Sequence, residues 1–227
     1  MESILQTNDY VGISFWLATA IMLASTVFFL AERGDVDRKW RTSLTVAALV
    51  TGVAFWHYLY MRAGWVATGE SPTVFRYIDW LITVPLQIVE FYLILAAVTV
   101  VRPVLFWKLL IASIVMLVGG YLGEAGLMAS MPAFVIGMIG WAAVIYLIFA
   151  GDAAKASTAS GNVASQTAFN AMRMIVLVGW AIYPIGYLVG DAGSADSLNI
   201  IYNLADLINK TAFGLVIWAA AVQDSGK

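Results

Sequence analysis

Seven long apolar segments limit what this chain can fold into. Each reaches the roughly 20 residues that a helix needs to cross about 30 Å of hydrocarbon. We expect the segments at residues 9–31, 42–63, 74–100, 104–126, 132–150, 170–190 and 198–222. Only 11% of the residues are charged, whereas a soluble domain carries about 25%. The sequence therefore predicts an all-α membrane protein, a bundle of seven transmembrane helices that forms one domain over residues 1–227.

Helix-breaking residues and polar stretches separate these segments. Gly64, Gly69 and Pro72 interrupt the chain between the second and third segments. Pro103 starts the fourth segment and Pro132 the fifth. We expect loops where charged or small polar residues replace apolar ones, at 32–41, 151–166 and 191–197. No internal repeat is evident, which argues against an inverted-repeat transporter.

Basic residues predict the orientation of the bundle. They are concentrated at alternate segment ends, at Arg33, Arg38, Lys39, Arg41, Arg102, Lys108, Lys155, Arg173 and Lys227. The opposite side offers only Arg62, at a helix end. Because lysine and arginine favour the cytoplasmic side of a membrane, we expect the N-terminus outside and the C-terminus in the cytoplasm.

The chain contains no cysteine and one histidine. This composition excludes disulfides, iron–sulfur clusters, thiolate metal sites and a histidine-rich metal centre. We therefore expect no bound metal, and we expect no nucleic-acid partner.

Lys210 lies near the middle of the last apolar segment, where a charge is costly and marks a functional site. Asp206 precedes it by four residues and shares its helix face. A buried amine that sheds its proton is a nucleophile and forms a Schiff base with an aldehyde. The pair therefore indicates a covalently held carbonyl cofactor whose positive charge is balanced by a carboxylate.

The third segment carries two carboxylates, Asp79 and Glu90, on one helix face. Their spacing along the sequence makes three turns plus about 20°, and separates them by about 16 Å along the helix axis. Arg76 lies one turn before Asp79, and Thr83 lies one turn after it. In the expected orientation, Asp79 is nearer the outside and Glu90 is nearer the cytoplasm.

This spacing is what a proton relay past Lys210 requires. Glu90 has no cation close in sequence, so we expect it to keep its proton and act as a donor. Asp79 lies near Arg76 and the cationic lysine, so we expect it to stay ionised and act as an acceptor. The alternative is that these residues form structural ion pairs within the bundle.

At these residues the sequence resembles the microbial (type 1) rhodopsins, and most closely the proteorhodopsins of marine bacteria. The resemblance covers all seven segments and is most specific at residues 76–93, 180–187 and 203–218. It implies all-trans retinal bound to Lys210 as a protonated Schiff base, and light-driven outward proton pumping across a bacterial inner membrane. Asp79 would accept the proton, and Glu90 would replace it from the cytoplasmic side. Asp206 would complete the counter-ion with Arg76.

The family's pump motif is a triplet, and Asp79, Thr83 and Glu90 match its proton-pumping form. Sodium pumps carry Asn-Asp-Gln there and chloride pumps replace the outer aspartate, so the resemblance implies neither. The protein would be a transporter rather than an enzyme. A photosensory rhodopsin that signals through a partner protein is the alternative, because pump and sensor share most of this chemistry. A seven-helix receptor or channel unrelated to retinal is a third possibility.

The resemblance also implies a retinal pocket. Its positions are Trp80, Met116, Trp180, Tyr183, Pro184 and Tyr187. For any one of them the alternative is ordinary packing within the bundle. Gln87 occupies the family's colour-tuning position, where glutamine resembles the blue-absorbing type.

His57 matches a family histidine that bonds to the outer aspartate, so we expect a contact with Asp79. The family places Trp16 of a neighbouring protomer against this histidine, which implies a ring-shaped homo-oligomer, a pentamer or hexamer. Glu124 either takes part in proton release or is a solvated charge near the outer surface. A family segment close to residues 32–35 forms salt bridges between protomers, but Gly34 interrupts that charge pattern and we do not expect those bridges.

Overall fold

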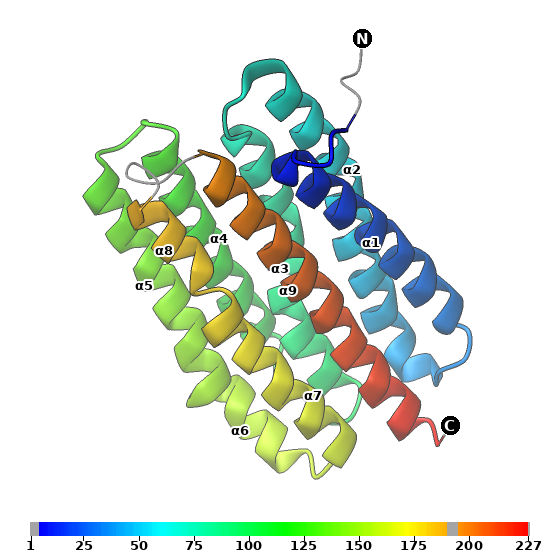
Figure 1. Cartoon of the computed structure of the whole chain (residues 1–227). Coiled ribbons are helices and arrows are strands. Elements are labelled where there is room, and N and C mark those ends of the chain that lie inside the picture. Colours follow the sequence, from blue (N-terminus) through cyan, green and yellow to red (C-terminus); the bar gives the residue numbers. More distant parts are fainter. Residues whose placement is uncertain (1–4, 190–194, 227) are drawn as a thin grey trace.

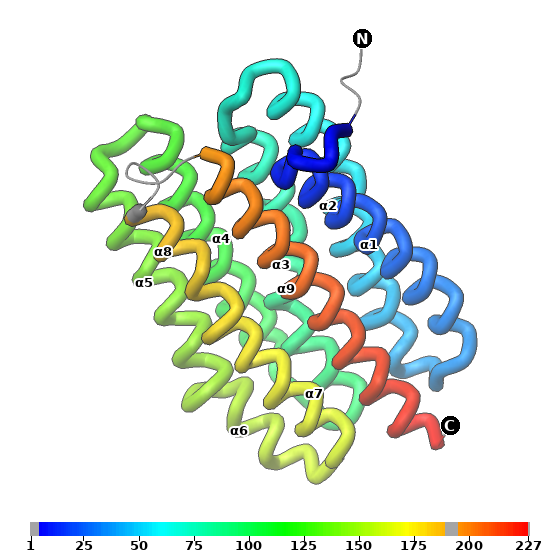
Figure 2. The backbone as a smooth tube through the Cα atoms, in the orientation of Figure 1, coloured from blue at the N-terminus to red at the C-terminus, as the bar shows by residue number. Residues whose placement is uncertain are grey.

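The structure is a computed structural model that describes residues 5–189 and 195–226. Throughout these residues the regular secondary structure is helical. The long helices lie side by side as one bundle (Figure 1), and the described chain begins and ends at opposite ends of it (Figure 2). Within the described residues, seven helical stretches are long and apolar enough to cross a membrane, which confirms the predicted class of fold.

The helices divide into seven spans as follows. The spans are α1 (Tyr10–Glu32), the short 3-10 helix η1 (Arg38–Trp40) with α2 (Arg41–Thr68), α3 (Thr73–Ala96), α4 (Val104–Glu124), α5 (Ser130–Phe149) with α6 (Asp152–Ala159), α7 (Val163–Met174) with the π-helical η2 (Ile175–Gly179) and α8 (Ile182–Val189), and α9 (Ala195–Asp224).

The predicted loop at 151–166 is wrong, because most of it is helical. α6 covers much of the stretch, and α7 begins at Val163. Half of the α6 residues are alanine, the strongest helix former, and Asp152 stands in the first turn, where a negative charge is favoured. The Asn162 side chain then caps α7 by accepting a hydrogen bond from Ser165 N at 2.8 Å. Low hydropathy therefore predicted the end of the apolar segment but not the end of the helix.

Other predicted boundaries also shift. Gly64 lies inside α2, and the helix ends instead at Gly69, whose φ of 69° suits glycine. Pro132 lies within the first turn of α5 rather than at its start, where its missing N–H costs no hydrogen bond. The third segment was predicted to reach residue 100, but its helix ends at Ala96. In the predicted loop at 191–197, residues 195–197 belong to α9, and residues 191–194 lie outside the described residues. Lys227, one of the basic residues used to predict the orientation, also lies outside them.

The two most buried spans are α3 and α9. In α3, 67% of the most apolar window is buried, and in α9 50%, against 22–44% in the other spans. These two helices hold the five ionisable residues that the sequence predicted at depth, and each is at most 3% exposed: Arg76, Asp79, Glu90, Asp206 and Lys210. Because the other spans surround α3 and α9, the charges face the bundle interior rather than lipid.

Three glycines bring α4 and α5 close together. A Cβ added to Gly119 would lie 2.6 Å from Gly137 N, and one added to Gly140 would lie 2.5 Å from Met116 N. Both obstacles are backbone atoms, which cannot move aside as the tip of a side chain can. Close approach through small residues is a main source of helix association in lipid, where apolar surface alone gives little preference.

We expect Gly140→Ala to destabilise the bundle by about 1–3 kcal/mol, because the added methyl forces α4 away from α5. The midpoint of unfolding in an SDS titration, followed by far-ultraviolet circular dichroism, measures the loss. Gly34→Ala is the matched control, since a Cβ there meets only Ala31 O, at 3.7 Å. Equal midpoints for the two variants would contradict the tight contact.

Candidate functional site: a buried lysine between two aspartates

Lys210 on α9 lies between two buried carboxylates. Its Nζ is 2.8 Å from Asp79 Oδ2 and 2.8 Å from Asp206 Oδ2. The predicted pair within α9 is therefore present, and α3 supplies the second acid. The cluster carries one positive and two negative charges when all three groups are ionised. Removing these charges from water is costly, so the arrangement requires further hydrogen bonds to the carboxylates.

Asp206 receives those further bonds. Tyr58 OH donates to Asp206 Oδ2 at 2.9 Å, and Tyr183 OH donates to Oδ1 at 2.6 Å. Trp80 Nε1 lies 3.1 Å from Oδ2 and donates as well. Together with Lys210, four side chains from four helices satisfy this carboxylate, and hydrogen bonds to an anion favour its ionised form.

Asp79 has fewer donors. Thr83 Oγ1 donates to the backbone oxygen of Asp79 at 3.0 Å and is 3.5 Å from Oδ2. His57 Nδ1 is 3.4 Å from Asp79 Oδ1 and 3.0 Å from Val53 O. The structure thus places His57 beside Asp79, as the sequence predicted. Nδ1 faces two acceptors, an arrangement that is satisfied when this nitrogen carries a proton.

Arg76 does not touch the aspartates directly. Its Nη2 donates to Asn199 Oδ1 at 2.6 Å and to Asn203 Oδ1 at 2.8 Å. Among the described residues no ion pair within 4.0 Å joins Arg76 to Asp79 or to Asp206. The two α9 amides therefore hold the guanidinium one turn away from the cluster, and its part in the counter-ion stays a prediction.

Glu90 is isolated on the same helix as Asp79. It is 1% exposed, and neither carboxyl oxygen has a hydrogen-bond partner among the described residues. No cation in that part of the chain forms an ion pair with it. The Ser43 hydroxyl is close to the carboxyl, but a buried carboxyl without a cation is far cheaper to keep neutral than ionised.

A largely aromatic cavity borders the cluster. It encloses about 800 Å³ of empty space, a volume that includes its open part. Its wall contains all eight residues predicted to bind the cofactor: Trp80, Gln87, Met116, Trp180, Tyr183, Pro184, Tyr187 and Lys210. Trp80 and Tyr183 pack edge to face, with ring centroids 5.1 Å apart. Residues spread over the third, fourth, sixth and seventh spans are thus brought to one cavity.

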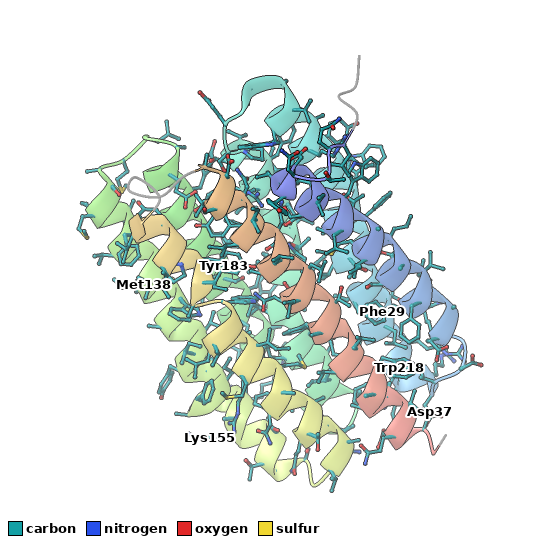
Figure 3. The ribbon with its side chains drawn as sticks, viewed as in Figure 1. Phe29, Asp37, Met138, Lys155, Tyr183 and Trp218 are labelled. Atoms are coloured by element: carbon teal, nitrogen blue, oxygen red, sulfur yellow. The ribbon has the colours of Figure 1, made fainter. Side chains whose placement is uncertain are left out.

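Some cavity residues were missed by sequence reasoning. They are Tyr77, Val84, Leu117, Gly120, Glu124, Phe134, Gly137, Met138, Trp141, Tyr202 and Asn209. Figure 3 shows Met138 and Tyr183 on the side of the bundle where α5 and α8 lie. Phe134, Met138 and Trp141 recur at helical spacing along α5, so this pattern could have indicated the face that α5 contributes. Glu124 lines the cavity and is exposed, so its position leaves both predicted roles open.

The sixth span widens beside the cavity. Its regular helix gives way to the π-helical η2, which frees backbone carbonyls from their usual partners. Asn209 Nδ2 donates to Gly179 O at 3.1 Å, and Trp141 Nε1 donates to Val176 O at 3.2 Å. Side chains from α9 and α5 therefore satisfy the widened turn and fix its position next to Lys210.

The fold and site define a seven-helix membrane protein with a lysine at the wall of a ligand cavity, and comparison with known proteins identifies its family. The family of bacteriorhodopsin-like proteins matches residues 9–224. The chain therefore belongs to the bacteriorhodopsin-like family, the microbial rhodopsins, as the sequence predicted.

Its relatives include proteorhodopsins of both colour types. The chain is 60% identical over 225 residues to the green-light absorbing proteorhodopsin of gamma-proteobacterium EBAC31A08, covering 97% of this chain and 90% of the relative. It is 59% identical over 226 residues to the blue-light absorbing proteorhodopsin of gamma-proteobacterium Hot 75m4, with the same coverage. The crystal structure of blue light-absorbing proteorhodopsin from Med12 is 65% identical, with a TM-score of 0.82, covering 95% of this chain and 99% of that one. The identities of 60% and 59% are too similar to assign the chain to the green-absorbing or the blue-absorbing type.

We expect Tyr58→Phe to lower the free energy of unfolding by about 1.5–3 kcal/mol, the usual worth of a hydrogen bond to a charged group. The variant removes a donor from buried Asp206 without changing the packing of the ring. Tyr60→Phe is the matched control, because Tyr60 is 47% exposed and its ring contacts with Trp56 and Phe75 survive the change. An SDS titration in which the two variants unfold together would contradict the importance of the Tyr58 bond.

Proposed function

We propose that this protein is a light-driven pump that moves protons out of the cell, with retinal held by Lys210. The observation that carries the proposal is the position of the Lys210 nitrogen, 2.8 Å from two carboxylates and at the wall of an aromatic cavity. The family supports retinal as the chromophore and transport rather than enzymatic turnover. The proton-pumping triplet of Asp79, Thr83 and Glu90 supports protons as the transported ion.

The residues of the cavity fit retinal. An amine, two carboxylates and a largely aromatic wall suit an apolar aldehyde whose linkage to lysine is positively charged. When bound to Lys210 as a protonated Schiff base, all-trans retinal would supply the absorption of light and an isomerisation that disturbs the Lys210 nitrogen. Trp80, Trp180 and Tyr183 line the cavity and would restrict which motions are possible there.

The contrast between the two aspartates supports Asp79 as proton acceptor. Asp206 accepts bonds from four side chains, which stabilise its anion, so protonating it would sacrifice several of them. Asp79 Oδ2 has Lys210 at 2.8 Å and Thr83 at 3.5 Å, and its Oδ1 has only the longer His57 contact. A proton that leaves the Lys210 nitrogen is therefore received at Asp79, within direct transfer distance, while Asp206 stays the counter-ion.

Glu90 is the proton donor in this proposal. It is buried without a cation, and only the Ser43 hydroxyl is close enough to influence it, so we infer that Glu90 is neutral and holds a proton in the resting protein. It lies further along α3 than Asp79, towards the end of the bundle that carries the C-terminus (Figure 1). With the C-terminus in the cytoplasm, as the basic residues predict, the acceptor is on the outer side and the donor on the inner side. Protons then move outward.

The finer properties of the pump follow the family resemblance. We place it in a bacterial inner membrane as a homo-oligomer, a pentamer or hexamer. Trp16 is 43% exposed, which leaves its ring accessible to a second copy, although Arg62 lies over it at 4.7 Å. Gln87 lines the cavity and donates to Asn209 O at 3.3 Å, so the family's colour-tuning position faces the proposed chromophore. Glutamine at this position resembles the blue-absorbing type. The absorption maximum of the purified pigment, compared with that of a green-absorbing relative, tests the colour.

We expect Lys210→Ala to abolish visible colour in membranes supplied with all-trans retinal, because no other amine lines the cavity among the described residues. Absorption spectroscopy of the purified protein measures this. Lys108→Ala is the control, since Lys108 is exposed and pairs with Asp152 away from the cavity. Full colour in Lys210→Ala would defeat the covalent attachment.

We expect Asp79→Asn to shift the absorption spectrum and stop proton release, since the anion beside the Lys210 nitrogen is lost. Glu90→Gln should instead leave the early steps intact and slow the transfer of a proton back to the Lys210 nitrogen. We expect the slowing to be about 10²-fold or more, as for the loss of a general acid. Flash spectroscopy separates the two effects. Glu70→Gln, on an exposed residue between α2 and α3, should change neither. An unchanged late step in Glu90→Gln would remove Glu90 as donor.

The direction of transport is tested in a lightly buffered suspension of bacterial cells that express the protein with retinal. We expect light to acidify the medium and a protonophore to abolish the change. Coloured cells without any pH response would overturn the pump and favour the photosensory alternative. Alkalinisation of the medium would instead contradict the proposed outward direction.

A further inference from the structure

A second cleft lies at the end of the bundle that carries the C-terminus, between α5, α6 and α7. It encloses about 1120 Å³ of empty space, including its open mouth. Figure 3 shows Lys155 at this end of the molecule, on α6. The proposed proton path does not use this cleft, because the carboxylates and Lys210 lie elsewhere, on α3 and α9.

The cleft is lined by two cations and by no acid. Lys155 and Arg173 are in its wall, from α6 and α7, and its lining residues include neither aspartate nor glutamate. Asp152, the carboxylate nearest in sequence to Lys155, is 2.6 Å from Lys108. Within the described part of the chain neither lining cation forms an ion pair within 4.0 Å. Asp152 is close enough to Lys155 to feel its charge but is paired with Lys108, so two cations without a carboxylate within 4.0 Å share one cleft and attract an anion.

The Arg173 side chain is held in place at the cleft, whereas Lys155 is exposed. The guanidinium lies over the Phe149 ring, 4.8 Å from its centroid, which holds it in place. Gln166 Nε2 donates to Ser157 O at 3.0 Å and thereby joins α7 to α6 across the cleft. The walls that carry the two cations are therefore tied together.

The depth of the cleft matches the level of lipid headgroups. α5 runs from Ser130 to Phe149, a rise of about 28 Å, close to the hydrocarbon thickness of about 30 Å. Phe149 and the guanidinium above it therefore lie where the hydrocarbon ends. Exposed apolar side chains are close in sequence to both residues: Met174, next to Arg173, is 47% exposed, and about one turn deeper Tyr146 is 62% exposed and Val178 63%. The headgroup of an anionic lipid could therefore contact the cations while its hydrocarbon chains lie on these exposed apolar side chains.

We propose that this cleft binds the phosphate of an anionic phospholipid, with Lys155 and Arg173 contacting the headgroup and the acyl chains lying along α5 and the sixth span. Free phosphate shares the headgroup chemistry, but the exposed apolar surface next to the cations favours the lipid. Basic pockets between membrane-spanning helices at the cytoplasmic side are a known mode of lipid recognition. The site does not depend on light or on retinal.

Native mass spectrometry of the purified full-length chain tests the site. The protein is supplied with equal amounts of dioleoylphosphatidylglycerol and dioleoylphosphatidylcholine in detergent, and retained lipid is counted. We expect retention of the anionic lipid, and a loss of roughly fivefold for each cation removed in Lys155→Gln/Arg173→Gln. Lys155→Arg/Arg173→Lys keeps both charges and should retain the lipid. Far-ultraviolet circular dichroism verifies that each variant is folded.

The matched control is Arg33→Gln/Arg38→Gln, which removes the same charge from the same end of the bundle but from the segment between α1 and α2. We expect it to retain the anionic lipid as the unchanged protein does. Equal losses in the two glutamine variants would overturn the site in favour of unspecific attraction. Equal retention of both lipids would also overturn it, as would displacement of the anionic lipid by millimolar inorganic phosphate.

Discussion

The need to keep a cation stable at bilayer depth determines the arrangement of this molecule. Lys210 is buried between two carboxylates, and a charge there is tolerated only with partners. One partner comes from its own helix and the other from α3, so these two helices must be adjacent and central. Their high burial follows from this requirement, and the remaining spans isolate the ion cluster from lipid.

The same cluster shows how similar residues acquire different tasks. Asp79 and Asp206 are equally buried and equally close to Lys210, yet their surroundings differ in the number of donors. Three of the donors to Asp206 are aromatic side chains, and two of them, Trp80 and Tyr183, also line the cavity. A substitution of Trp80 or Tyr183 that reshaped the cavity would therefore also remove a donor from Asp206, so the shape of the cavity and the surroundings of the carboxylate are coupled in this protein.

The chemistry within single helices could be predicted from sequence. Lys210 follows Asp206 by one turn, and Asp79 and Glu90 share a face of α3, because helical spacing alone relates such residues. Contacts between distant segments could not be predicted in this way. Tyr58 and Asn199 carry no signal of their partners, since spacing along one helix does not say which face its neighbour presents. α6 was mistaken for a loop because its polarity was weighed above the helix propensity of its alanines.

The π-helical turn in the sixth span has a mechanical consequence. Where the regular ladder of backbone hydrogen bonds is interrupted, a helix is less stiff, and η2 separates the span into two rods. One rod, α7, is attached through Asn162 to Asp224 near the chain's end. The other, α8, carries Tyr183 and its bond to Asp206. Because Asn209 and Trp141 hold η2 in place, a displacement of α7 at the far end of the span reaches Tyr183 and the ion cluster only through this anchored turn.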